Sequence, residues 1–283
     1  MRALVAVCLL ITSFAASALA APEGVQTNTV RFVTAGKSDW RIVCPPPACP
    51  AINWAAKELQ RYLQQISGCK PPIVQRTRGK PSLAVGLRPE LAPEDRAVLP
   101  PPAAGYDGYA VAVVPATRKV PARIVIAGDN ARGVIYGVYD LLERLGCRWF
   151  YPAEDADDPE VVPQRDTLRL RAGSWAVASP MKYRICNGSE WFFEMQPAPA
   201  LKQLEWAMKA RYNAMGGQAD THTPLETQYQ QLAESGLLAE LARRDMLLHG
   251  PAHCFNLLLR AEDHLSNHPE WFGLRNGKRV PQT

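Results

Sequence analysis

The chain has 283 residues, a formal net charge of +5, 47% apolar residues and 21% charged residues. This length is enough for two domains with sizeable cores, and the ordinary balance of apolar and charged residues excludes an intrinsically disordered chain. The positive charge is mild and spread along the sequence, and no run of Lys and Arg alternates with aromatic residues, which argues against a nucleic-acid-binding protein.

The first twenty residues have the features of a secretion signal. Arg2 supplies a positive start, an apolar stretch follows, and Ala18-Leu19-Ala20 supplies the small-x-small pattern of a cleavage site. We interpret residues 1–20 as a signal peptide cleaved after Ala20, and expect a secreted or periplasmic protein with no membrane attachment after cleavage. A retained membrane anchor is the alternative, although the apolar run is near the short limit for crossing a bilayer.

Cysteines remain after removal of the signal peptide, and an even number of them in an oxidising compartment permits disulfides. Cys44 and Cys49 flank a proline-rich loop and are the most plausible pair, while the other pairings stay open. The sequence has no CxxC motif, so neither a thioredoxin-like centre nor a zinc ribbon is expected. The cysteines in question are Cys44, Cys49, Cys69, Cys147, Cys186 and Cys254.

Strands and helices alternate in the first half of the chain. Residues 51–68 form the clearest helix, because their apolar side chains share one face and Gly68 is placed to end the helix. The members of that apolar face are Ile52, Ala55, Ala56, Leu59, Leu63 and Ile66. The predicted strands of this half cover residues 29–35, 40–45, 72–75, 82–87, 108–114 and 122–128.

A second helix is predicted within residues 129–152. Asn130 is placed to cap its first turn and Gly146 to end it, after which "CRWFYP" returns as a strand. The buried stripe of this helix comprises Val134, Val138, Leu141, Leu142 and Leu145. An acidic segment and a further strand at 166–173 close the first domain near residue 175.

A new pattern begins at Ser179. A strand at 181–188 is followed by a helix at 200–215, with a Glu205–Lys209 pair on its exposed face. A helix at 225–245, broken near Gly236, precedes another strand within 246–255. Alternation of this kind predicts the start of a series of parallel βα units.

Two segments of the first half carry a family resemblance. "AAKELQRYLQQISG" at 55–68 and "IVIAGDNARGVIYGVYDLLERLGCRWFYP" at 124–152 resemble the N-terminal accessory domain of family 67 α-glucuronidases and family 20 β-hexosaminidases. In those proteins a small α/β domain precedes a (β/α)8 TIM barrel. "HPEWFGLRNGKR" at 268–279 is similar to a group of secreted bacterial proteins, classed as a domain of unknown function, with the same architecture. Gly133 and Gly137, four residues apart, would let their helix approach its sheet closely.

The resemblance implies an α/β protein in two parts. Residues 21–175 would form an α+β accessory domain with a mixed sheet and helices, and residues 176–283 the first three or so βα units of an incomplete (β/α)8 barrel. A full barrel needs about 200–250 residues. In hexosaminidase-like enzymes the acid/base carboxylates follow the fourth strand, which would lie beyond Thr283.

The expected function is therefore that of the N-terminal part of a secreted glycoside-hydrolase-like, carbohydrate-active protein. In its full-length form the protein would hydrolyse O-glycosidic bonds with two carboxylates, whereas this chain alone would be inactive. The alternative is a non-catalytic carbohydrate-binding or surface-assembly protein, with a second chain completing the barrel. The expected partner is an oligo- or polysaccharide, and neither a nucleic acid nor a cofactor is expected.

Candidate sugar contacts lie at the ends of the predicted barrel strands. Arg184 resembles the arginine that hydrogen-bonds sugar hydroxyls in hexosaminidase-like enzymes, and a structural salt bridge is its alternative. Trp191 is placed to stack on the apolar face of a sugar, unless it packs in the core. His222 and His253 are candidates for contacts with sugar hydroxyls, with ordinary polar loop or core positions as the alternative.

No metal site is expected. His249 and His253 are four residues apart, but Gly-Pro between them disfavours a helix, and on a strand they would lie about 13 Å apart. That separation is too wide for one ion, whose bonds to nitrogen are near 2 Å. Glu190 and Glu194 are too weak a pattern to be named as acid and base.

Overall fold

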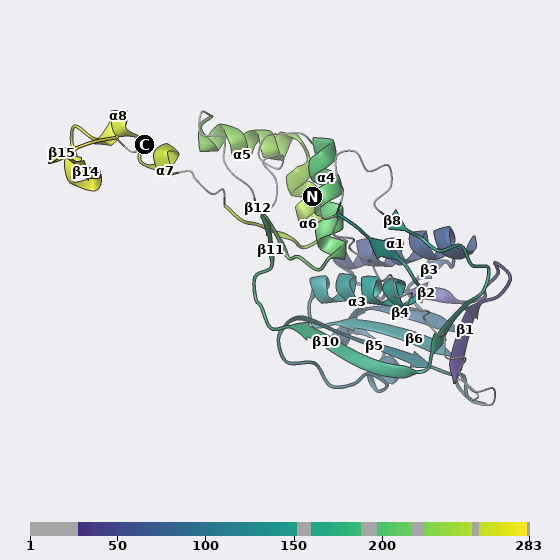
Figure 1. The fold of residues 1–283 in the computed structure, drawn as a ribbon. Coiled ribbons are helices and arrows are strands. Elements are labelled where there is room, and N and C mark those ends of the chain that lie inside the picture. Colours follow the sequence, from purple (N-terminus) through teal and green to yellow (C-terminus); the bar gives the residue numbers. More distant parts are fainter. Residues whose placement is uncertain (1–27, 152–159, 188–196, 217–222, 251–254, 282–283) are drawn as a thin grey trace, which may run out of the picture.

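The computed structural model describes residues 28–151, 160–187, 197–216, 223–250 and 255–281 (Figure 1). These residues form a first domain around a six-stranded sheet and a second domain around three strands. Within the described ranges no helix is long and apolar enough to cross a bilayer. The expectation of a signal peptide falls on residues 1–20, which lie outside the described residues.

The main sheet of the first domain is mixed, as the sequence predicts. Its strand order is β10-β5-β6-β4-β2-β3. The β2, β3, β4 and β6 strands run parallel, while β5 is antiparallel to both of its neighbours. The strands are β2 (Arg41–Val43), β3 (Ile73–Val74), β4 (Ser82–Leu87), β5 (Tyr106–Val114), β6 (Arg123–Gly128) and β10 (Gly173–Ser179).

Two short antiparallel pairs lie outside the main sheet. β1 (Thr29–Val33) pairs with β9 (Leu168–Arg171), and β7 (Arg148–Trp149) pairs with β8 (Glu160–Val161). The last strand of the main sheet, β10, continues past the boundary near residue 175 that the sequence predicts. The first domain therefore extends to Ser179, because β10 is paired with β5 up to that residue.

Two helices cover one face of the main sheet and lie side by side in Figure 1. α1 (Pro50–Ser67) and α3 (Ala131–Arg144) bury the apolar stripes that the sequence predicts, because a period of 3.6 residues places these side chains on one face. Gly68 ends α1 in the left-handed conformation with φ of 75°. Asn130 caps α3, its side chain accepting a hydrogen bond from the Gly133 amide at 2.8 Å.

Glycines allow α3 to lie unusually close to the sheet. A Cβ atom on Gly133 would collide with the carbonyl oxygen of Gly108 in β5, and one on Gly137 would lie 2.7 Å from Ile126 Cγ2. The predicted packing role of Gly133 and Gly137 is therefore confirmed. Close backbone contact at this point also brings the start of α3 next to the start of β5. As a result, Asn130 and Arg132 lie beside Asp107.

The second face of the main sheet is covered by residues 88–105 instead of by a long helix. This segment contains η1 (Arg88–Glu90) and α2 (Pro93–Arg96). It shields a smaller apolar cluster that comprises Val43, Ala84, Leu91, Ala112, Val125 and Ala127. The cover is incomplete, and it leaves a pocket at the edge of this cluster.

Three parallel strands form the second domain in sequential order. They are β11 (Ile185–Asn187), β12 (Ala214–Gly216) and β13 (Leu247–Leu248). α4 (Pro197–Lys209) lies between the first two strands, and α5 (Leu225–Glu234) and α6 (Leu237–Arg243) lie between the last two. Gly236, with φ of 81°, separates α5 from α6 and confirms the predicted break. The βα alternation is thus observed, whereas the described strands do not themselves form a closed barrel.

The last described residues form small elements that lie apart from the two domains in Figure 1. These are α7 (Phe255–Leu258), α8 (Ala261–His264), η3 (Pro269–Trp271) and a hairpin of β14 (Leu274–Arg275) with β15 (Lys278–Arg279). The hairpin forms because Asn276 and Gly277 adopt φ of 52° and 74°, the signature of a tight two-residue turn.

Three expectations are wrong. The helix predicted at 200–215 ends earlier, because α4 stops at Lys209 and residues 214–216 form the strand β12. Cys44 and Cys49 are not joined, because both are free thiols, and Cys44 is buried with its Sγ 3.9 Å from Asn53 Oδ1. Lys209 does not lie on an exposed face beside Glu205, since its side chain is only 5% exposed and pairs with Glu160 of the first domain. Glu205 pairs instead with Arg244 at 3.3 Å.

Candidate functional site

The carboxyl ends of the three parallel strands mark the face where βα proteins bind substrates. The strands lead there into residues 188–196, 217–222 and 251–254. Three of the predicted sugar contacts, Trp191, His222 and His253, fall in these segments and lie outside the described residues. Their role stays a prediction.

Arg184 lies at the opposite, amino end of β11, and its guanidinium is directed at protein groups. Nη2 donates to Asp107 Oδ2 at 2.6 Å and approaches the Tyr136 hydroxyl at 3.3 Å. Nε and Nη1 donate to the backbone carbonyls of Arg211 and Met181, each at 2.8 Å. This geometry is that of the salt bridge given above as the alternative. The sugar contact proposed for Arg184 has no support from the described contacts.

Asp107 gathers donors from both domains. Its carboxylate accepts hydrogen bonds from Arg132 Nε at 3.1 Å and from Asn130 Nδ2 at 2.7 Å, both in the first domain. Arg184 and Asn213, whose Nδ2 lies 2.9 Å away, donate from the second domain. We call this set of five residues the Asp107 junction.

The electrostatics of the Asp107 junction favour the ionised carboxylate. Burial alone would raise the pKa of Asp107, which is 8% exposed. Hydrogen bonds from Arg184, Asn130 and Asn213, with the charge of Arg132, outweigh burial and hold the pKa below its ordinary value. A carboxylate with four donors has no spare acceptor for proton transfer, so the junction is suited to joining domains and not to acid/base chemistry.

The junction extends through Arg132 to Asp245, which precedes β13. Nη1 of Arg132 donates to the Asp245 carbonyl at 2.6 Å and pairs with its carboxylate at 3.2 Å. A cavity of about 350 Å³ lies beside these residues, with Tyr106, Lys182 and Tyr183 in its lining. It borders the residues that precede β11 and β12, which is the face opposite to the expected sugar cleft.

A second contact between the domains surrounds Glu160. Tyr62 lies within hydrogen-bond distance of both carboxylate oxygens of Glu160, at 2.9 and 2.8 Å, and Lys209 forms an ion pair with the same group. Trp149 Nε1 donates to the Tyr62 hydroxyl at 2.9 Å. Burial, with the nearby Glu160 charge, raises the pKa of Tyr62 above its ordinary range, so its hydroxyl stays protonated. This contact again joins helices of the two domains.

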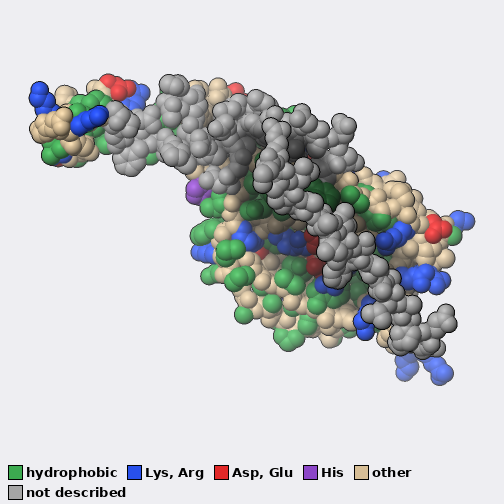
Figure 2. Space-filling model, in the orientation of Figure 1, with side chains coloured by type: hydrophobic (Ala, Val, Ile, Leu, Met, Phe, Trp, Pro, Cys, Tyr) green, Lys and Arg blue, Asp and Glu red, His purple; other side chains and the backbone are tan. Residues whose placement is uncertain are grey.

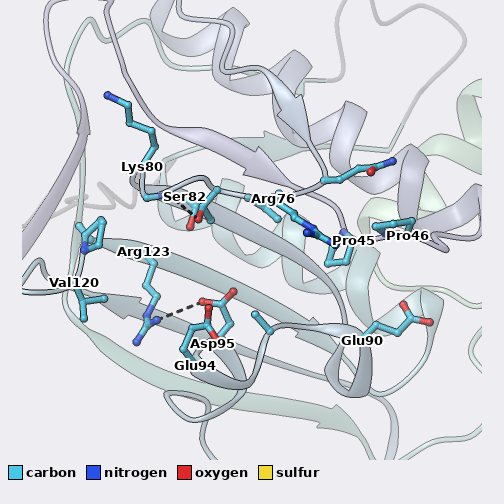
Figure 3. A pocket seen from close by; sticks show the side chains of 17 residues that line it. Pro45, Pro46, Arg76, Lys80, Ser82, Glu90, Glu94, Asp95, Val120 and Arg123 are labelled. Atoms are coloured by element: carbon cyan, nitrogen blue, oxygen red, sulfur yellow. Dashed lines mark hydrogen bonds and ion pairs between the residues drawn. The ribbon is translucent and has the colours of Figure 1, made fainter.

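A polar pocket lies on the second face of the main sheet. We call it the sheet pocket; its volume is about 610 Å³, and Figure 3 shows the side chains around it. Ser82 and Arg123 start adjacent strands, paired in register, and project to the face opposite the helices. Asp95 of α2 and Arg76 of the loop before β4 complete the polar lining. Polar residues at the first position of otherwise apolar strands were the sequence signal for this pocket, and it was missed.

The basic side chains on one face of the molecule are dispersed. On the face seen in Figure 2, the Lys and Arg side chains of the described residues form separate groups and not one continuous stripe. Among the described residues, no group of three His, Cys, Asp or Glu side chains is placed to hold a metal ion.

Comparison with known families supports the resemblance found in the sequence. Residues 33–141 match the family described as glycosyl hydrolase family 67 N-terminus. The match runs from the last residue of β1 into α3 and covers less than half of the chain, so it shows that this segment is similar to the N-terminal domain of that family. Among curated protein sequences none matches the chain.

Solved structures of glycoside hydrolases align with parts of this chain. A family GH115 4-O-methyl-α-glucuronidase with specificity for decorated arabinogalactans aligns with a TM-score of 0.53 and 15% identity, over 80% of this chain and 30% of that one. A Streptomyces plicatus β-hexosaminidase aligns with a TM-score of 0.44 and 13% identity, over 78% of this chain and 42% of that one. A GH138 enzyme targeting pectin rhamnogalacturonan II aligns with a TM-score of 0.45 and 14% identity, over 73% of this chain and 30% of that one. The chain thus spans less than half the length of each.

Proposed function

We propose that this chain supplies the accessory domain and the first βα units of a secreted glycoside-hydrolase-like protein that acts on carbohydrates. The observation that carries the proposal is the order of its parts. A segment that matches the family 67 N-terminal model is followed, after the strands β7 to β10, by parallel strands that alternate with helices. In this reading the full-length form hydrolyses O-glycosidic bonds.

Hydrolysis of a glycosidic bond needs two carboxyl groups, about 5–5.5 Å apart for retention or about 6.5–9.5 Å apart for inversion of configuration. The described strands β11, β12 and β13 contain no acidic residue. The two groups that hold the domains together, Asp107 and Glu160, are occupied by cationic partners. We therefore assign the cleavage chemistry to the full-length form and expect this chain alone to be inactive.

The loops after the parallel strands would contribute one wall of the sugar cleft. Trp191 after β11 would stack on the apolar face of a sugar ring, as aromatic rings do with C–H groups. His222 and His253, in the loops after β12 and β13, would hydrogen-bond hydroxyls. Arg184 is left out of this assignment because the Asp107 junction holds its guanidinium.

Affinity electrophoresis tests the proposal. The purified chain is run through gels that contain glucuronoxylan, arabinogalactan, pectin or a soluble chitin derivative, and reducing ends are measured in parallel. We expect slower migration in at least one gel, no release of reducing ends, and loss of the retardation in Trp191→Ala. Phe150→Ala, which removes an exposed aromatic ring from the first domain, is the matched control.

Two results would contradict the proposal. Unchanged migration in every polysaccharide gel argues against carbohydrate recognition by this chain. Release of reducing ends by the purified chain shows that its own residues suffice for cleavage and refutes the assignment of catalysis to the full-length form. A full-length form that binds polysaccharide without cleaving it supports the alternative, a non-catalytic carbohydrate-binding or surface-assembly protein.

A further inference from the structure

We propose that the sheet pocket of the first domain is a binding site for a small sugar acid, a hydroxylated molecule that carries one carboxylate. This site lies on the face of the main sheet opposite α1 and α3, and it is separate from the sugar cleft proposed above. The inference goes beyond the proposed function, because it assigns a ligand to the accessory domain itself.

The pocket is built by the fold and not by chance side chains on a convex surface. Alternation along β4 and β6 turns Leu83 and Ile124 toward the helices, so Ser82 and Arg123 must face the other way. α2 then places Asp95 over the start of β6, where the Asp95 side chain is only 9% exposed. Figure 3 shows Arg123 reaching toward Asp95, with Glu94 beside it.

The cationic group at this site is poorly satisfied by the protein. The Arg123 side chain is 15% exposed, and its one partner in the described part of the chain is Asp95 Oδ1, at 3.6 Å. Its Nε is buried with no hydrogen-bond partner. A guanidinium offers five N–H donors, and buried donors are nearly always paired in native proteins. A ligand carboxylate is the acceptor that matches this geometry best, because it can accept two parallel N–H groups.

The pocket also offers hydrogen-bond acceptors to a ligand, in the side chains of Asp95 and Ser82. Asp95 is 6% exposed, and burial raises its pKa even though the Arg123 charge opposes that effect. Ser82 is 3% exposed and lines the same pocket. Neither side chain makes a hydrogen bond within the described residues. Ligand hydroxyls can donate to the carboxylate and exchange hydrogen bonds with the Ser82 hydroxyl.

Size and charge balance narrow the ligand class. A volume of about 610 Å³ lies within the range of roughly 300–1,000 Å³ usual for small-molecule sites. Three cationic and three acidic side chains line the pocket, so a polyphosphate or nucleic acid would meet as much repulsion as attraction. Pro45, Pro46, Val120 and Pro121 supply an apolar rim for sugar C–H groups. A molecule with several hydroxyls and a single carboxylate satisfies all of these features.

Arg76 provides a second cation from an exposed loop, and Figure 3 places it near Pro45 on the opposite side from Arg123. Arg123 can hold the ligand carboxylate, while Arg76 adds positive charge from the opposite side and the acidic side chains take the hydroxyls. Lys80 also lines the pocket but points away from its centre in Figure 3. The expected specificity is therefore for the anion over the neutral sugar and over an amino sugar.

Isothermal titration of the purified chain with sodium glucuronate, glucose and glucosamine tests the inference. We expect saturable binding of glucuronate and at least tenfold weaker binding of the other two sugars. Arg123→Met and Arg76→Ala should each weaken glucuronate binding at least tenfold. Arg118→Ala removes the same charge from an exposed loop outside the pocket and should leave the affinity unchanged. Thermal unfolding of each variant shows whether it is folded.

The inference is overturned if the wild-type chain does not bind glucuronate, if glucosamine binds as tightly, or if Arg76→Ala leaves the affinity unchanged. Arg76 is exposed, so this variant remains informative even if Arg123→Met fails to fold. Failure here is distinguishable from failure of the proposed function. Polysaccharide retardation depends on Trp191, whereas glucuronate titration depends on Arg76 and Arg123.

Discussion

Replacing Asp107 by Asn should weaken the attachment of the two domains. The substitution keeps the shape of the side chain but removes its charge, and it offers an amide donor where Arg132 and Arg184 also donate. Asn tolerates the left-handed backbone found at this position, where φ is 51°, so backbone strain is not added. The loss of stability in Asp107→Asn therefore measures the contribution of the carboxylate charge and its hydrogen bonds.

The magnitude follows from the partners that each arginine keeps. Removing one member of a buried ion pair costs about 3–5 kcal/mol. Arg184 retains two backbone carbonyls and Arg132 retains Asp245, which places the cost near the low end, about 3 kcal/mol. For a chain of this size, about 3 kcal/mol corresponds to a lowering of Tm by roughly 6–12 °C.

Differential scanning calorimetry at pH 7 is the assay, with Asp39→Asn as the control that removes an exposed carboxylate. Because the folded state lowers the pKa of Asp107, its stabilisation is complete above the ordinary pKa near 4 and disappears as the pH falls through the lower folded value. The difference between wild type and variant should shrink accordingly in acid. An Asp107→Asn protein as stable as wild type at pH 7, or a difference that does not shrink as the pH is lowered below about 4, refutes the reasoning.

Three further outcomes are expected. Gly133→Ala drives a methyl group into the Gly108 carbonyl and should cost at least about 2 kcal/mol in urea unfolding, whereas Gly273→Ala, where nothing lies within 4 Å of the added Cβ atom, should cost less. Glu160→Gln leaves Lys209 buried without its anionic partner and should lower stability by about 3 kcal/mol in the same assay; an unchanged midpoint would show that the pair is dispensable. In native protein the exposed thiol of Cys49 should be labelled by a thiol reagent well before that of Cys147, since burial raises the pKa of Cys147 to about 11; peptide mapping that finds Cys49 in a disulfide would contradict the structure.

Local features of the fold could be predicted because their signals are local. The apolar stripes of α1 and α3 follow from helical periodicity, the cap at Asn130 from side-chain chemistry, and the break at Gly236 from the conformational freedom of glycine. The hairpin at Asn276-Gly277 has an equally local signal, since Asn-Gly is the pair that favours a tight two-residue turn.

Contacts between distant residues could not be predicted from one sequence. Arg184 finds its anion in Asp107, on another sheet, and Lys209 finds its anion in Glu160. The sheet pocket requires the register of β4 against β6 and the position of α2, neither of which is encoded in residue spacing. The family resemblance predicts the order of the domains. The partners of individual charged side chains are visible only in the three-dimensional structure.

The course of β10 limits how this protein can be divided for laboratory work. A cut at residue 175 severs the strand that covers the edge of β5, and an uncovered edge is prone to pair with another molecule. Moving the cut beyond Ser179 preserves that strand but deprives Asp107 of Arg184 and Asn213. Neither half is self-sufficient at either cut. An investigator who wants the accessory domain in isolation must therefore re-engineer its surface where the neighbouring lobe has been removed.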